Sequence, residues 1–102
     1  MHYVLEYDLA PGYLERREAF RGAHLALSWE AVEQGGLVLG GAVGEPPEGA
    51  LLVFQGEGPE VAERFAARDP YVLNGLVRKW TVRPWLTVVG HAAARPVRPP
   101  LP

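Results

Sequence analysis

The sequence predicts an α+β domain in which a four-stranded antiparallel sheet carries two helices on one of its faces. Alternating apolar residues predict strands over residues 2–8 and 77–89, and two further apolar segments, 37–43 and 50–55, predict a hairpin. Segments with helical periodicity separate the first strand from the hairpin and the hairpin from the last strand. The resulting order β-α-β-β-α-β is the split β-α-β arrangement, which places both helices on the same side of the sheet.

The first helix is predicted between residues 13 and 34, and its side chains fall into three stripes. Gly35-Gly36 ends it, because glycine adopts the left-handed cap conformation without steric cost. One apolar stripe contains Tyr13, Phe20, Ala23, Leu27 and Ala31, a second contains Leu14, Leu25, Trp29 and Val32, and the polar stripe between them contains Arg17, Arg21, His24 and Ser28. A surface helix needs only one apolar stripe. We therefore expect this helix to contact its own sheet and also a partner subunit or a ligand.

The second helix is expected to begin at Pro59, which suits a first helical position, and to end at Arg68. Its apolar face consists of Val61, Ala62, Phe65 and Ala66. Asp69 precedes a proline and is biased away from helical backbone, so it can cap one short further turn that stops at Gly75. In the last strand, Pro84 cannot donate a ladder hydrogen bond and marks an edge position or a bulge.

The length of 102 residues indicates one domain, expected over residues 1–90, followed by a proline-rich tail over residues 91–102. Cysteine is absent, which excludes disulfides and thiol catalysis. A formal net charge of -2 with both signs scattered argues against nucleic-acid binding. There is no apolar run long enough to span a membrane, and the acidic start does not resemble a signal peptide, so we expect a cytoplasmic protein.

The face of the sheet without helices should expose much apolar surface from tyrosine, tryptophan, leucine and valine side chains. That surface is large for a monomer. We therefore expect a homodimer that packs sheet to sheet.

Two residues are candidates for acid–base chemistry. His24 is the residue type that titrates near neutral pH, and Asp69, at the turn after the second helix, can lie near the first helix and orient the imidazole ring. The alternative is that His24 is a structural residue bonded to a backbone carbonyl and that Asp69 is only a helix cap.

Four further residues are candidates for ligand binding. Arg17 and Arg21 lie one turn apart and can converge on a carboxylate or phosphate, or else they pair in solvent with Glu18 or with acids of a partner chain. Tyr71 and Trp85 can form the walls of an aromatic pocket, or else belong to the core or a dimer interface. The histidines have no metal-ligand spacing and the glycines form no phosphate-binding loop, so no metal or cofactor is predicted.

Three short motifs in fixed order resemble a known family. They are Arg21-Gly22-Ala23-His24-Leu25, then Gly40-Gly41, then Asp69-Pro70-Tyr71 with Gly75. Together they resemble the YciI-like (YCII-related) proteins over about residues 1–88. The resemblance implies a ferredoxin-like fold, a dimeric α+β barrel, and an active-site dyad of His24 and Asp69. Gly22 stands where the family often has proline.

These observations lead to a first hypothesis, a small cofactor-free enzyme of the lyase or isomerase type acting on a small anionic or aromatic metabolite. His24 would move the proton, Asp69 would orient its ring, Arg17 or Arg21 would hold an anionic group, and Ser28 would donate a further hydrogen bond. The alternatives are a non-catalytic dimer that binds a small ligand or serves as an accessory module, and a structural dimer that uses its tail for recognition.

Overall fold

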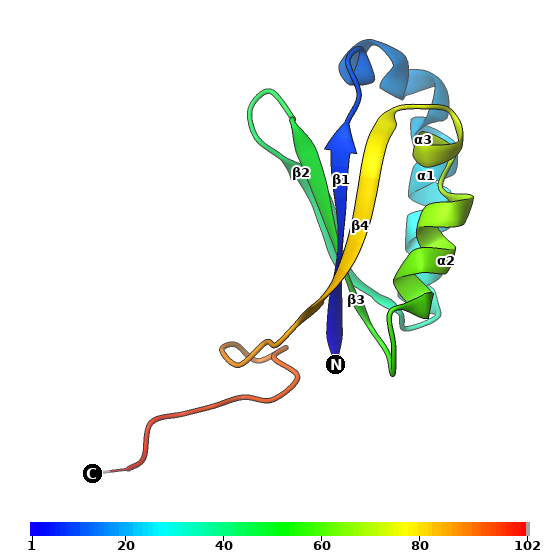
Figure 1. Cartoon of the computed structure of the whole chain (residues 1–102). Coiled ribbons are helices and arrows are strands. Elements are labelled where there is room, and N and C mark those ends of the chain that lie inside the picture. Colours follow the sequence, from blue (N-terminus) through cyan, green and yellow to red (C-terminus); the bar gives the residue numbers. More distant parts are fainter. Residues whose placement is uncertain (102) are drawn as a thin grey trace.

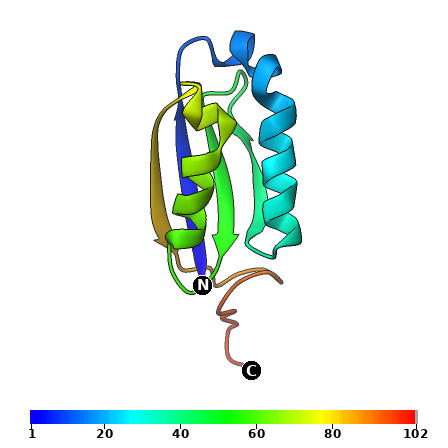
Figure 2. The same cartoon turned by 90° about the vertical axis from the view of Figure 1, so that its right-hand side faces the viewer.

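We describe residues 1–101 in a computed structural model, which contains four strands and three helices (Figure 1). Their bounds are β1 His2–Leu9, α1 Tyr13–Glu33, β2 Leu37–Val43, β3 Gly49–Gln55, α2 Glu60–Arg68, α3 Pro70–Leu73 and β4 Val77–Trp85. The sheet is antiparallel with the order β2-β3-β1-β4. Figures 1 and 2 show the helices on one face and the other face open. The predicted fold class is confirmed.

The central strand β1 directs alternate side chains toward the helices. Tyr3, Leu5 and Tyr7 are buried, because each lies on the face that α1 and α2 cover. The core continues with Leu52 and Phe54 of the neighbouring strand β3, and α2 adds Ala62, Phe65 and Ala66. Helix α2 and the centre of the sheet therefore form the main hydrophobic core.

The last strand is shorter than expected. It ends at Trp85, whose partner His2 begins β1, so no strand remains beside it to continue the ladder. The sheet order places β4 at the edge, and Pro84 lies within this strand. An edge strand is one of the two positions that the sequence predicted for this proline. The register shift between β1 and β4 instead falls at Asp8–Leu9.

Beyond β4 the chain turns back on itself. The backbone amide of Arg95 donates to the carbonyl of Thr87, and that of Val97 donates to Val88. The predicted tail therefore begins with a hydrogen-bonded turn before it extends away from the sheet (Figure 1). Its last residue, Pro102, lies outside the described residues.

Helix α1 ends close to the expected position. Gly35 adopts φ 84°, which favours glycine, and its amide donates to the carbonyl of Val32. Over the part of the chain that the structure describes, no helix is both long and apolar enough to cross a membrane.

Candidate active site

The centre of the candidate site is a hydrogen bond between His24 and Asp69. Asp69 ends α2 in extended backbone and caps α3, where its Oδ1 accepts from the amide of Tyr71 at 3.0 Å. The same oxygen lies 2.8 Å from Nδ1 of His24, which α1 presents from the other side. Asp69 thus caps a helix and contacts the histidine at once, so the two predicted roles are combined.

Tyr7 completes the environment of the carboxylate and was missed in the sequence analysis. Its hydroxyl donates to Oδ2 of Asp69 at 2.6 Å, from the helix-facing side of β1. A tyrosine between apolar positions of a central strand must find a buried partner for its hydroxyl, and that signal was available in the sequence. Asp69 has no exposed surface, and its two oxygens accept from Tyr7, Tyr71 and His24. A buried carboxylate with three donors is held in one orientation.

This arrangement fixes the tautomer of His24. Because a carboxylate oxygen accepts hydrogen bonds, Nδ1 of His24 carries the proton and Nε2 has the lone pair. The imidazole ring stacks on Tyr71, with centroids 3.9 Å apart and planes 9° apart, and its edge meets Phe65. Nε2 is therefore presented as a proton acceptor on a ring that its neighbours hold in place.

The tyrosines remain neutral hydrogen-bonding groups. Burial, and then the adjacent Asp69 carboxylate, raise the pKa of Tyr7 far above its ordinary value. Burial, followed by the neighbouring Tyr13, raises the pKa of Tyr71 to about 12, although Arg21 and Arg17 oppose the shift. Tyr7 consequently donates to Asp69 throughout the neutral pH range.

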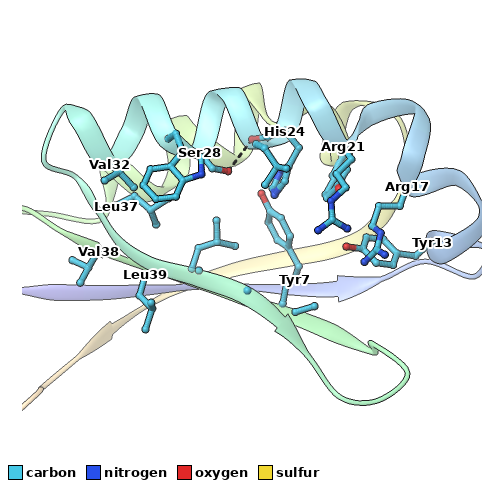
Figure 3. A pocket seen from close by; sticks show the side chains of 18 residues that line it. Tyr7, Tyr13, Arg17, Arg21, His24, Ser28, Val32, Leu37, Val38 and Leu39 are labelled. Carbon is cyan, nitrogen blue, oxygen red and sulfur yellow. Dashed lines mark hydrogen bonds between the residues drawn. The ribbon is translucent and has the colours of Figure 1, made fainter.

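His24 opens onto a cavity of about 390 Å³ between α1 and the strands β2 and β3 (Figure 3). Four residues that were predicted to bind a ligand contribute to its lining, namely Arg17, Arg21, Ser28 and Tyr71. Asp69 does not line the cavity but lies behind His24. The structure thus brings the predicted residues to one place, with the aspartate as the support of the histidine.

The two arginines point into the cavity beside Tyr13 (Figure 3). The guanidinium of Arg17 lies 5.6 Å from the centre of the Tyr13 ring, and its Nε is buried without a hydrogen-bond partner. Within residues 1–101 neither Arg17 nor Arg21 forms a salt bridge, so the pairing with Glu18 that was considered does not occur. Two uncompensated guanidinium groups in a cavity can bind an anion.

Ser28 and Trp85 differ from what the sequence suggested. The hydroxyl of Ser28 donates to the carbonyl oxygen of His24 at 2.8 Å, so it faces the cavity mainly as an acceptor. Trp85 is half exposed and lies outside the cavity that contains Tyr71, so of the two alternatives the structure does not place these aromatic residues together as pocket walls.

The opposite wall was not anticipated. It comes from residues 37–42 of β2 together with Ala50 and Leu52. A Cβ at Gly40 would lie 3.2 Å from Cγ of Leu52, so a larger residue there would crowd this wall. Among the described residues, no three histidine, aspartate or glutamate side chains cluster as metal ligands would.

Comparisons with known proteins agree with this architecture. The chain resembles the 5-chloro-2-hydroxyhydroquinone dehydrochlorinase from Burkholderia phenoliruptrix, whose structure was solved in complex with 2,5-dihydroxybenzoquinone. The two sequences are 22% identical, the match covers 85% of this chain and 95% of the other, and the TM-score is 0.70. It also resembles protein Atu4242 from Agrobacterium tumefaciens, with 14% identity, 93% and 99% coverage and a TM-score of 0.56. At these identities the likeness shows the fold alone. A search of curated proteins found no significant match.

The family assignment rests on a comparison of the sequence itself. The model of the YCII-related domain matches residues 1–86, which include all four strands and every residue of the candidate site. The motifs around His24 and Asp69 lie within that match. The chain belongs to the YCII-related family.

Proposed function

We propose that the protein is a small enzyme that performs general acid–base chemistry with its own side chains on a small anionic or aromatic metabolite. The observation that carries the proposal is the orientation of His24, whose Nδ1 is bonded to Asp69 while the ring lines a cavity. A histidine supported in this way is suited to take and return protons near neutral pH.

The chemistry would proceed by proton transfer. Nε2 of His24 removes a proton from an acidic C–H or O–H group of the substrate, and the resulting imidazolium is stabilised by the Asp69 carboxylate. The electron pair left on the substrate forms an enolate or phenolate, beside the guanidinium groups of Arg17 and Arg21. The proton then returns to another atom in an isomerisation, or a leaving group departs in an elimination.

The similar structure from Burkholderia supports the choice of reaction class. That protein is described as a dehydrochlorinase, and removal of hydrogen chloride takes a proton and a chloride ion from the substrate. A fold of this kind can therefore house proton abstraction on a small ring compound.

The test is proton exchange in bound compounds. Small acids and phenols would first be screened for thermal stabilisation, and binders would then be incubated in D₂O with the protein and followed by NMR. We expect exchange of an acidic C–H proton in the native protein and a loss of about 100-fold or more in His24→Gln. Asp8→Asn, at an exposed ion pair away from the cavity, is the control.

The alternative function is ligand binding without turnover. It would be favoured if compounds stabilise the protein but none exchanges, or if His24→Gln exchanges as fast as the native protein. Both proposals use the same cavity, so the exchange experiment separates them.

We also propose that the chain forms a homodimer through the open face of the sheet. Val4, Leu51, Val53 and Trp85 give this face apolar surface, and none of these residues belongs to the core cluster. A symmetric partner would cover it. Sedimentation should show a dimer that Leu51→Lys converts to a folded monomer, whereas a native monomer would contradict the proposal.

A further inference from the structure

We infer that the cavity selects a small amphipathic carboxylate, bound with its carboxylate between Arg17 and Arg21 and its apolar part toward Val32, Leu37 and Val38. This inference rests on the proposed function of the same site and specifies its substrate class. It follows from the uneven distribution of charge along the cavity.

One end of the cavity is cationic without compensation. Arg17 and Arg21 lie there beside Tyr13, and no aspartate or glutamate contributes to the lining. Asp69, the acid nearest to His24, is occupied by its three donors and lies behind the ring. The Nε of Arg17 is buried and out of reach of a ligand, so an anion at this end would bond to the terminal nitrogens of the two guanidinium groups and supply their missing countercharge.

The other end is apolar. Val32 of α1 and Leu37 and Val38 of β2 lie at this end (Figure 3), and Trp29 also lines the cavity. Ser28 marks the boundary, and its hydroxyl donates to the helix backbone. A second charged group would find no countercharge among the side chains of this end, where Trp29 offers a single indole N–H as a donor. The ligand should therefore carry one charged head and an apolar remainder.

The spacing along α1 places the reacting atom between these ends. At about 1.5 Å of rise per residue, His24 lies about 4.5 Å along the axis from Arg21 and about 12 Å from Val32. The acidic proton of the substrate should therefore lie a few bonds from the carboxylate, on the side of the apolar group. The cavity volume of about 390 Å³ matches a compound of the size of hydrocinnamate rather than acetate.

Four probes test this reading by isothermal titration calorimetry. Hydrocinnamate is the expected ligand, hydrocinnamamide lacks its charge, propionate lacks its ring, and benzyl phosphate replaces the head group. We expect hydrocinnamate to bind about tenfold or more tightly than each of the other three. Equal binding of the amide or of propionate, tighter binding of benzyl phosphate, or no hydrocinnamate binding at millimolar concentration would each overturn the inference.

Matched variants locate the two ends. Arg17→Gln and Arg21→Gln should each weaken hydrocinnamate about tenfold and leave the amide unchanged, whereas Arg64→Gln removes the same charge from α2 outside the cavity and should change neither. Val38→Ser should weaken hydrocinnamate but not propionate, and Val43→Ser, farther along β2 and outside the cavity, is its control. An equal effect of Arg64→Gln would show that only general electrostatic attraction is at work.

The His24→Gln variant tests the proposed acid–base function independently of the substrate class. If the carboxylate preference holds but proton exchange survives in His24→Gln, the acid–base function fails and the substrate class stands. If ligands without a carboxylate exchange in a His24-dependent way and carboxylates do not, the acid–base function stands and the substrate class fails.

Discussion

Helices α1 and α2 cover the same face of the sheet but are attached to it in different ways. The nine residues of α2 include three buried core residues, Ala62, Phe65 and Ala66, whereas the 21 residues of α1 include one, Tyr13. Helix α1 packs against the core mainly through partly buried residues, Phe20, Leu27, Ala31 and Val32, and leaves a cavity between itself and β2. The comparison indicates that α2 contributes fully buried core residues, whereas α1 supplies Arg17, Arg21 and His24 of the candidate site.

The residues exposed on α1 support this division. Trp29 is 63% exposed although it is the largest side chain of the helix, and Leu25 beside it is 40% exposed. Both border the cavity, so they surround its opening rather than fill the core. Apolar residues at the edge of a cavity can contact a ligand or a second subunit.

The largest expected effect separates the two helices by stability. Phe65→Ala in α2 should lower the free energy of unfolding by about 3–5 kcal/mol, because it leaves a cavity in the core. Trp29→Ala in α1, although it removes a larger side chain, should cost less than about 1 kcal/mol. Urea unfolding of both variants measures the difference, and similar losses would contradict the division.

A smaller loss is expected where the two helices meet at Asp69. Asp69→Asn places an amide NH₂, itself a donor, among the donors of Tyr7, His24 and Tyr71, which need acceptors. It should therefore lower the free energy of unfolding by about 1–3 kcal/mol. Asp8→Asn, which breaks an exposed ion pair with Arg78, should cost less than about 1 kcal/mol. An equal cost for the two substitutions would mean that the Asp69 network is not formed in solution.

The pH dependence of stability should reveal the tyrosines under the site. In the unfolded chain a tyrosine loses its proton near pH 10, but the raised pKa values of Tyr7 and Tyr71 keep both protonated in the fold above that pH. Their contribution is thus complete below pH 10 and is lost as the pH rises, for Tyr71 between pH 10 and about 12. Tyr7→Phe should reduce the slope by about one proton. An unchanged slope in alkaline unfolding curves would contradict the burial of Tyr7.

The smallest effect should be a gain in stability on α1. Gly22 has no atom within 4 Å of the position of a Cβ, and it lies in the helix interior. Gly22→Ala should therefore raise the free energy of unfolding by about 1 kcal/mol without changing ligand binding. A loss of binding in this variant would show that the helix must flex at the site.

The sequence predicted those features that rest on periodicity and local chemistry. The first three strands, the start of the last strand, both helices and the cap at Asp69 each follow from spacing or from a residue's own backbone preference, and Pro84 limited its own position to an edge or a bulge. The polar stripe of α1 also identified Arg17, Arg21 and His24 as neighbours, because helical geometry alone determines that arrangement.

What the sequence could not supply are contacts between distant segments. The bond from Tyr7 to Asp69 spans 62 residues and depends on how β1 and α2 pack together. The pairing of His24 with Asp69, 45 residues apart, was expected from the predicted position of Asp69 near the first helix and from the resemblance to the family, and not from any local pattern. The wall from β2 and the separation of Trp85 from Tyr71 are likewise products of the sheet order. The last strand ends at Trp85 because its partner strand β1 begins at His2. No property of the β4 sequence reveals that limit.

The most direct test of the account is the protonation pattern of the His24 ring, measured by ¹⁵N NMR of the histidine side chains at a pH where the ring is neutral. We predict that the proton is on Nδ1 in the native protein, that Asp69→Asn mixes the two tautomers, and that hydrocinnamate shifts the Nε2 resonance. A proton on Nε2 in the native protein, or an Nε2 resonance that no ligand of the cavity alters, would contradict the claim that His24 is oriented by Asp69 to act in the cavity.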